Sequence, residues 1–271
     1  MVEHRLMTSP EKQNQQAWDD LVRSGSSFAN PATAEDFTHP DRVINPFGWI
    51  PEPIAGQRVL CLAAGGGRHG PVFAAQGAEA TIVDLSEAML ALDREVAQRE
   101  GLSVMTLQTS MCDLSDLGDC SFDVVLQPVS TCYVENLRPM FQEVSRVMKA
   151  GGIYVSQHKQ PISLQAGAMP GANGAYQIRE PYYRSGPLPP VSGSEHREAG
   201  AQEFLHTLEA ILGGLCAQGF TIHDVREPRH ADPSAPKGSF RERSHFVPPY
   251  IAIKALRDAS APPSSPLWMP S

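Results

Sequence analysis

Along the middle of the chain, short apolar runs alternate with segments whose apolar residues recur at helical spacing. Five runs have the length and apolar content of buried strands and lie near residues 58–63, 80–84, 103–108, 122–127 and 152–157. Three helical patterns lie between them, near residues 69–77, 86–99 and 137–149. This alternation predicts an α/β fold in which a parallel sheet carries helices on both faces. Right-handed crossovers then place every loop that follows a strand at one edge of the sheet, where ligands bind.

The pattern changes on either side of this core, which spans residues 56–160. Residues 1–55 contain a predicted helix at 10–24, with Trp18 on its apolar face, followed by an aperiodic arm. Residues 161–197 form an insertion rich in glycine and proline. Because such a segment is too long for a plain connector, we expect a substrate cap, a surface flap or an oligomer contact. We favour the cap, since the insertion leaves from the ligand edge of the sheet.

The last part of the chain, residues 198–257, returns to regular patterns and completes the core. Residues 198–218 carry an apolar stripe at helical spacing that stops at Gly219, which predicts one long helix. Residues 220–225 and 250–256 are expected to form a final pair of strands. The composition of residues 258–271 predicts a disordered tail.

Three consecutive glycines, Gly65 to Gly67, separate the first predicted strand from the helix that follows. A glycine turn lets backbone N–H groups at a helix N-terminus approach a ligand closely. Asp84 ends the next predicted strand, where its carboxylate can accept the hydrogens of both hydroxyl groups of a ribose. Close packing of the turn, and Asp84 acting as a helix N-cap, are the alternatives that need no ligand. We interpret the combination as the first half of a nucleoside-cofactor site.

Four motifs narrow the choice of cofactor. They are the glycine turn at 58–70, DLSEAML at 84–90, SFDVV at 121–125 and VSRVMKAGG at 144–152. In this order and spacing they resemble the class I S-adenosylmethionine-dependent methyltransferases that act on small molecules, over roughly residues 56 to 158. The chain departs from the family at Cys61, where an acid is usual, at Ala63, where a glycine is usual, and at Ser110, where an aspartate is frequent.

The resemblance implies a Rossmann-like, doubly wound sheet of seven strands, mostly parallel with an antiparallel last strand. It implies S-adenosylmethionine as the cofactor. The arm at 28–53 is expected either to pack on the core as an irregular segment or, as N-terminal segments often do in this family, to close over the cofactor as a lid. By the same resemblance, the cofactor contacts the glycine turn and the loops after the second, third and fourth strands. The residues concerned are Ala63, Ala64, Gly65, Gly67, Asp84, Leu85, Met89, Ser110, Met111, Cys112 and Gln127.

The acceptor side has a weaker signature, because methyl transfer from a sulfonium is an in-line displacement that needs alignment and exclusion of water. We expect transfer to an O, N or S atom of a small molecule. His158, after the fifth strand, and His206, beside an apolar stripe, are the candidate proton acceptors, because imidazole titrates near neutral pH. Tyr133, Tyr176 and Tyr183 are the candidates for lining an apolar substrate pocket.

Composition argues against several other partners. The formal net charge of −8 over 271 residues disfavours nucleic acid, since phosphate binding needs clustered Lys and Arg. No stretch approaches the roughly 20 apolar residues that span a membrane. Five cysteines without a C-x-x-C pair, and a start without an apolar leader, predict a cytoplasmic protein with no metal site. The sequence leaves the oligomeric state open.

Two other functions fit parts of the pattern. Gly65, Gly67 and Gly70 satisfy G-x-G-x-x-G, so a nicotinamide-dependent oxidoreductase is one alternative. The Tyr-x-x-x-Lys pair that short-chain members need occurs only as Tyr250 and Lys254. That pair lies in a predicted strand, which would hold the two side chains roughly 13 Å apart and argues against this reading. A protein that binds S-adenosylmethionine without turnover is the other alternative.

Overall fold

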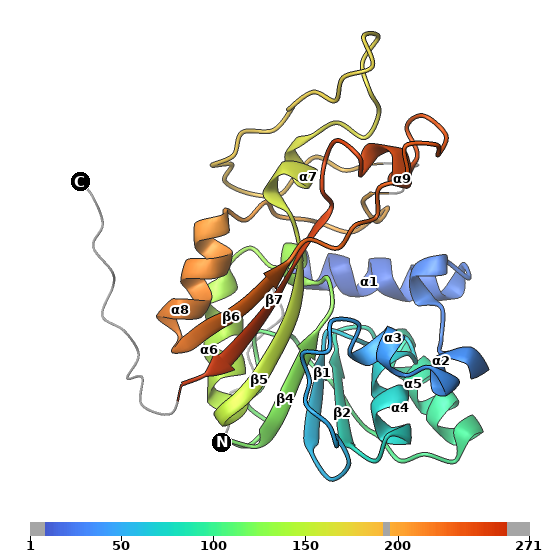
Figure 1. Cartoon of the computed structure of the whole chain (residues 1–271), viewed down its shortest axis with the longest axis vertical. Coiled ribbons are helices and arrows are strands. Elements are labelled where there is room, and N and C mark those ends of the chain that lie inside the picture. Colours follow the sequence, from blue (N-terminus) through green and yellow to red (C-terminus); the bar gives the residue numbers. More distant parts are fainter. Residues whose placement is uncertain (1–8, 192–195, 259–271) are drawn as a thin grey trace.

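Seven strands form one sheet in the order β3-β2-β1-β4-β5-β7-β6 in the computed structural model, which describes residues 9–191 and 196–258. The strands are β1 Arg58–Leu62, β2 Glu79–Asp84, β3 Met105–Gln108, β4 Phe122–Gln127, β5 Met148–Lys159, β6 Phe220–Arg226 and β7 Tyr250–Arg257. Strands β1 to β5 pair in parallel, and β7 runs antiparallel between β5 and β6 (Figure 1). The predicted Rossmann-like fold with its antiparallel last strand is confirmed.

The helices of the core begin and end where the sequence supplies caps. Ser86 accepts a hydrogen bond from the backbone N–H of Met89 at 3.1 Å to start α5, and Gly101, at φ 67°, ends it. The helices are α1 Ser9–Arg23, α2 Ala34–Thr38, α3 Asp41–Ile44, α4 His69–Ala75, α5 Glu87–Glu100, α6 Leu137–Val147, α7 Pro161–Gln165, α8 Gly214–Ala217 and α9 Phe240–Arg243. Short 3-10 turns lie at Ser27–Ala29 and Thr131–Tyr133, and a π-helical turn at Glu209–Gly213.

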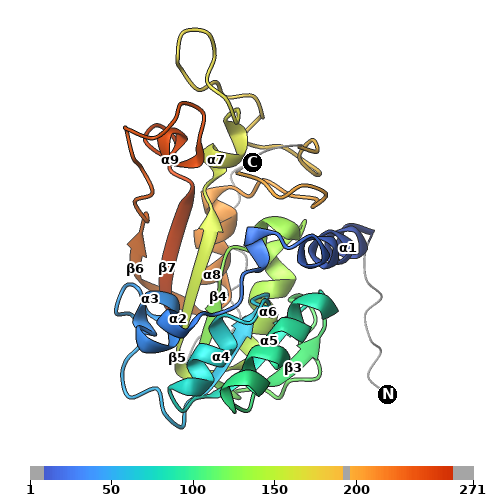
Figure 2. The same ribbon diagram turned by 90° about the vertical axis from the view of Figure 1, so that its right-hand side faces the viewer.

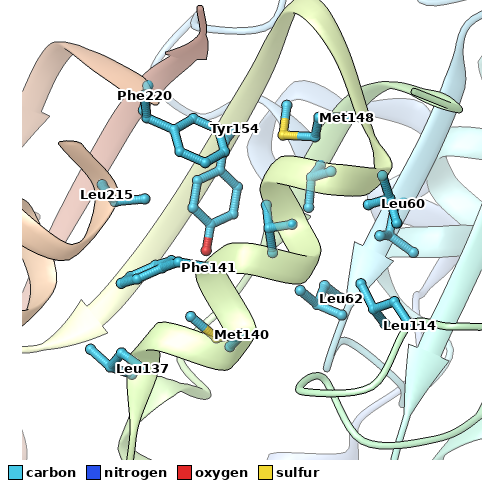
Figure 3. Packing of buried hydrophobic residues seen from close by; sticks show 14 of the residues in the cluster. Leu60, Leu62, Leu114, Leu137, Met140, Phe141, Met148, Tyr154, Leu215 and Phe220 are labelled. Atoms are coloured by element: carbon cyan, nitrogen blue, oxygen red, sulfur yellow. The ribbon is translucent and has the colours of Figure 1, made fainter. Parts of the chain in front are cut away.

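The core lies on both faces of the sheet. Along β1, Leu60 and Leu62 join the cluster under α6 and α8, whereas Val59 and Cys61 join the cluster under α3, α4 and α5. Figure 3 shows the first cluster, in which side chains of α6 pack toward Tyr154 on β5. Burying both faces requires an apolar residue at nearly every position, which explains the continuous apolar runs in the sequence.

The helix predicted at 198–218 is wrong over its first half. Helical backbone is confined to the π-helical turn and α8, and Phe204 instead forms an isolated bridge with the insertion. Lys159 at the end of β5 pairs with Glu198 at 2.7 Å and with Glu203 at 2.6 Å, and all three side chains are buried. These tertiary contacts override the helical spacing of the apolar residues.

Helix α1 confirms the helix predicted at 10–24, and it lies beyond the upper ends of β1 and β2 in both views (Figures 1 and 2). Buried Asn14 donates to the carbonyls of Tyr133 at 3.0 Å and Gln202 at 3.1 Å. Asp19 accepts from the Ser86 hydroxyl at 2.5 Å. The helix is thereby fixed over the carboxyl ends of the strands. The predicted disordered tail falls, apart from residue 258, outside the described residues.

The insertion projects beyond the end of β5, with α7 at its start and α9, from the β6–β7 loop, beside it (Figures 1 and 2). The buried guanidinium of Arg243 on α9 ties the two together. It donates to the carbonyls of Ser163 at 2.8 Å, Ala166 at 3.1 Å and Gly167 at 3.1 Å. The insertion is therefore anchored on the β6–β7 loop.

Candidate active site

A cavity of about 440 Å³ lies at the carboxyl ends of the parallel strands, and α1 forms part of its wall. Its lining is mostly apolar, with a few polar groups, which is typical of small-molecule sites. The predicted site residues that line it are Ala63, Ala64, Gly65, Asp84, Leu85, Met89, Ser110, Met111 and Tyr133. The topology of the sheet thus brings together residues that are up to 70 positions apart (Tyr133 and Ala63) in the sequence.

The glycine turn is held by two carboxylates, the half-buried Asp84 and the fully buried Asp93. Gly65 N–H donates to Asp84 at 2.9 Å, and Gly66 N–H donates to Asp93 at 2.9 Å. A Cβ on Gly65 would lie 2.8 Å from the Cβ of Met89 and 3.0 Å from Asp84 Oδ2. No side chain larger than hydrogen fits there without displacement, so the backbone of the turn is open to close approach by a ligand.

Ala63 stands where the resembled family usually has glycine, and its φ of 47° lies in the left-handed region. A non-glycine residue pays about 1–2 kcal/mol for this conformation. Replacing Ala63 with glycine is therefore expected to raise the free energy of unfolding by about 0.5–1 kcal/mol, after the greater chain entropy of glycine is deducted. Chemical denaturation measures the change. Ala64→Gly is the matched control and should lower stability, because no positive φ occurs at Ala64.

Asp84 ends β2 and faces the cavity. Its Oδ2 accepts from Gly65 N–H and its Oδ1 from Ser86 N–H, each at 2.9 Å. Burial raises the pKa of Asp84, while the hydrogen bonds from Ser86 and Gly65 oppose that rise. A carboxylate oxygen can accept more than one hydrogen bond, so both oxygens of Asp84 remain able to accept from a bound diol.

The segments that follow β3 and end β4 contribute fewer residues to the cavity wall than predicted. Ser110 lines the cavity and donates to Glu11 of α1 at 2.6 Å, so an acid from another element stands beside the position where the family often has aspartate. Cys112 packs beside the core, and Gln127 is buried and donates to Ser130 at 2.9 Å. Gly67 packs against α5, where a Cβ would lie 2.8 Å from the Leu92 carbonyl oxygen. Cys112, Gln127 and Gly67 do not line the cavity.

The structure speaks against both predicted proton acceptors. His158 is fully buried and outside the cavity, with Nδ1 2.9 Å from the Thr131 hydroxyl and Nε2 2.9 Å from the Ser156 hydroxyl. Burial lowers the pKa of His158 to about 3. His206 Nε2 donates to the carbonyls of Thr131 at 3.1 Å and Val134 at 2.9 Å. Both rings help to hold the segment after β4 in place. His206 bonds to two carbonyl groups of that segment, and His158 lies between a hydroxyl of that segment and a hydroxyl of β5.

Two of the three predicted tyrosines also lie elsewhere. Tyr176 donates to Glu242 at 2.5 Å, and Tyr183 is 84% exposed, so neither lines the cavity. Tyr133 does line it, with its ring edge-on to Trp18 at 5.7 Å between centroids. Sequence spacing could not separate these cases, since all three tyrosines lie in irregular segments whose course depends on tertiary contacts.

Several lining residues were not predicted. Many of them come from segments far from the glycine turn in the sequence, among them Glu11, Asn14, Trp18, Glu198, His230 and Tyr250, whereas His69 lies next to that turn. None of the described residues of the 161–197 insertion lines the cavity. His69 carried a detectable signal, because it begins the helix directly after the glycine turn. The described residues contain no group of three or more His, Cys, Asp and Glu that could hold a metal ion. No described helix is long and apolar enough to cross a membrane.

Comparison with known proteins agrees with this geometry. Residues 60–156 match a family described as a methyltransferase domain. An uncharacterized methyltransferase of Bacillus subtilis is 36% identical over 230 residues, which cover 80% of this chain and 89% of the relative.

Solved structures show the same fold. An S-adenosylmethionine-dependent methyltransferase of Mesorhizobium loti has a TM-score of 0.63 at 26% identity, covering 78% of this chain and 94% of that one. A geranyl diphosphate C-methyltransferase of Streptomyces coelicolor, solved with S-adenosyl-L-homocysteine, has a TM-score of 0.61 at 14% identity, covering 93% of this chain and all of that one (100%), and shows the fold alone.

The chain belongs to the class I S-adenosylmethionine-dependent methyltransferases. It is accordingly an enzyme that uses S-adenosylmethionine, and the oxidoreductase and non-catalytic alternatives fall away. The residues present suit this cofactor: an acid at the end of β2, a glycine turn that a Cβ would fill, and apolar walls.

Proposed function

We propose that this protein transfers the methyl group of S-adenosylmethionine to an O, N or S atom of a small molecule. The observation that carries the proposal is the single cavity that joins the glycine turn and Asp84 to a second, aromatic half lined by Trp18, Tyr133 and Tyr250. Its volume of about 440 Å³ falls within the range of small-molecule sites.

The cofactor half would be held by residues from four elements. Backbone N–H groups of the glycine turn would contact the amino-acid portion, and Asp84 would accept from the ribose hydroxyl groups. Leu85, Met89 and Met111 supply apolar surface for the adenine. Glu11, placed by its hydrogen bond with Ser110, would supply the acid that the family often has at position 110. When bound, the cofactor supplies an activated methyl group on a sulfonium.

The protein's own contribution to the transfer is alignment and exclusion of water. Helix α1 closes one side of the cavity through Asn14 and Trp18, which supports the proposal that the N-terminal segment acts as a lid. The 161–197 insertion, which we still regard as a cap, would act indirectly, because it is anchored by Arg243 to the loop that carries His230.

The test is a methyl-transfer assay with isotopically labelled S-adenosylmethionine and a fractionated bacterial extract. Label is expected in the low-mass fraction, and S-adenosylhomocysteine should suppress it. Incorporation confined to protein or RNA would overturn the small-molecule assignment. Asp84→Asn provides the matched negative control, because it alters the cofactor half of the cavity only.

A further inference from the structure

One imidazole nitrogen at the cavity has no hydrogen-bond partner within residues 9–191 and 196–258. His230 comes from the loop between β6 and β7 and lines the same cavity as Asp84. Its Nε2 is buried and makes no hydrogen bond with any residue that the structure describes. Leaving a buried polar atom unpaired costs about 1–3 kcal/mol, so such an atom calls for an absent partner, a water molecule or a ligand.

Aromatic contacts hold the ring in place. Its ring centroid lies 5.5 Å from that of Phe240 of α9, with 70° between the ring planes. The corresponding values for Tyr250 of β7 are 5.4 Å and 80°, so both contacts have edge-to-face geometry. His196 also stacks on Phe240, with 5.6 Å between the two ring centroids. A ring packed between two elements keeps its nitrogen at a fixed place, which is what a group that contacts a reacting atom requires.

The charged and titratable groups that face His230 or share its surroundings come from several elements. They are Arg241 on α9, Tyr250 on β7, Glu198 on the cavity wall and His196, which stacks on Phe240. Burial, and then the positive charge of Arg241, lower the pKa of His230 below its ordinary value of 6.5. At neutral pH the ring is therefore uncharged, and in the tautomer protonated at Nδ1 the Nε2 atom offers a lone pair.

The surrounding wall favours an uncharged, ring-sized acceptor. Trp18, Val129, Tyr133 and Val134 line the cavity, and burial raises the pKa of the Tyr133 phenol far above its ordinary value, so it stays neutral. Aromatic surface of this kind packs well against a flat apolar molecule. A neutral nitrogen acceptor in such a wall matches a polar group that donates a hydrogen. Among such groups, a hydroxyl on an aromatic ring is uncharged and acidic enough to pass its proton to an imidazole.

We propose that His230 is the proton acceptor for a phenol-like acceptor, an apolar ring that carries one reacting hydroxyl group. This inference rests on the proposed function. In the step, the hydroxyl oxygen forms a bond to the methyl carbon as the bond between that carbon and the sulfonium sulfur breaks. The hydroxyl proton passes to His230 Nε2, and the electron pair of the broken bond remains on sulfur, which gives S-adenosylhomocysteine.

The experiment compares phenol with 4-nitrophenol, whose hydroxyl is more acidic, as acceptors for the wild-type protein and the variants His230→Ala and His223→Ala. His223 is exposed on β6 and outside the cavity, so its variant should match the wild type. For His230→Ala we expect kcat with phenol to fall by about 10²–10⁴ and the acidic limb of the pH–rate profile to disappear. The loss with 4-nitrophenol should be much smaller, because that acceptor ionises without a base.

A binding measurement distinguishes failure of this inference from failure of the proposed function. With S-adenosylhomocysteine bound, adding phenol should shift the imidazole 15N signal of His230 and leave that of His223 unchanged. Equal losses for phenol and 4-nitrophenol, or an unshifted His230 signal, would overturn the role of His230. A wild-type protein that labels the low-mass extract but not phenol would overturn the acceptor class. If no low-mass compound is labelled, the proposed function itself is wrong.

Discussion

Replacing Asp84 with asparagine is expected to weaken binding of S-adenosylhomocysteine by roughly 10- to 150-fold, because a hydrogen bond to a charged acceptor contributes about 1.5–3 kcal/mol. Asparagine keeps the size of the side chain but has one acceptor oxygen in place of two. That oxygen must then serve the turn, where Gly65 and Ser86 already donate to the two carboxylate oxygens. Titration calorimetry measures the change.

Asp93→Asn is the matched control for this loss. Asp93 accepts from the next residue of the same turn, Gly66, but it does not line the cavity. Burial raises the pKa of Asp93 to about 7, so a neutral amide is close to the form present at neutral pH. We expect this variant to bind within a fewfold of the wild type. If both variants lose affinity equally, Asp84 acts through the shape of the turn and not through contact with the ribose.

The second large effect is expected on stability, from Lys159→Met. Lys159 is 5% exposed and pairs with Glu198 and with Glu203, whose exposure is 0%. Removing one partner of a buried ion pair leaves an uncompensated charge and lowers the free energy of unfolding by about 3–5 kcal/mol. Chemical denaturation should show a lower midpoint with little change in slope. Adding Glu198→Gln to the variant should recover part of the loss, because Glu198 loses its cationic partner whereas Glu203 keeps Arg197.

Lys149→Met is the control for the same chemical change at an accessible pair. The Lys149 side chain is 41% exposed, and its 2.7 Å contact with Asp123 lies near solvent. Pairs of this kind contribute about 0–1 kcal/mol. A loss at Lys159 no greater than the loss at Lys149 would contradict the idea that the buried cluster stabilises the fold.

The dependence of this contribution on pH follows from the direction of the pKa shift. Burial acts to lower the pKa of Lys159, but the neighbouring acidic groups more than offset it, so the folded-state value lies above the unfolded value of 10.5. A raised value means that the contribution is fully present below pH 10.5 and is lost only as the pH rises through the folded-state value. The difference in free energy of unfolding between wild type and Lys159→Met should therefore stay constant from pH 6 to pH 9.

Residue order alone brought the proposed cofactor residues of the glycine turn and of the loop after β2 to the wall of one cavity. The strand, the glycine turn and Asp84 are close in sequence, and the parallel topology brings the later loops to the same edge without any long-range information. Gly67 and Gln127 were included because their positions in the motifs matched, yet the Gly67 backbone packs against α5 and the Gln127 side chain bonds to Tyr154 of β5. Sequence position fixes which loop a residue belongs to, and the neighbouring elements decide which way it points.

Residue order was a poor guide to the half of the cavity proposed to hold the methyl acceptor. His158 ends a strand at the ligand edge, and topology alone favoured it, but two hydroxyl groups enclose its ring away from the cavity. His230 lies in a polar loop with no periodic pattern, and only the packing of α9 against β7 carries it to the cavity wall. The helix predicted at 198–218 was wrong for a related reason. The buried carboxylates of Glu198 and Glu203 both pair with Lys159, and this part of the chain is extended where it passes Lys159.

The sequence by itself determined the alternation of strands and helices in the core, the two-sided burial of the sheet and, through the family resemblance, the class of cofactor. These depend on local periodicity and on short motifs, which act over a few residues. The tertiary structure decided which side chains line the cavity, how α1 forms part of its wall and where the 161–197 insertion is anchored. Those features depend on hydrogen bonds, ion pairs and ring contacts between segments as far apart as Asn14 and Gln202, and their energy appears only when the chain has folded.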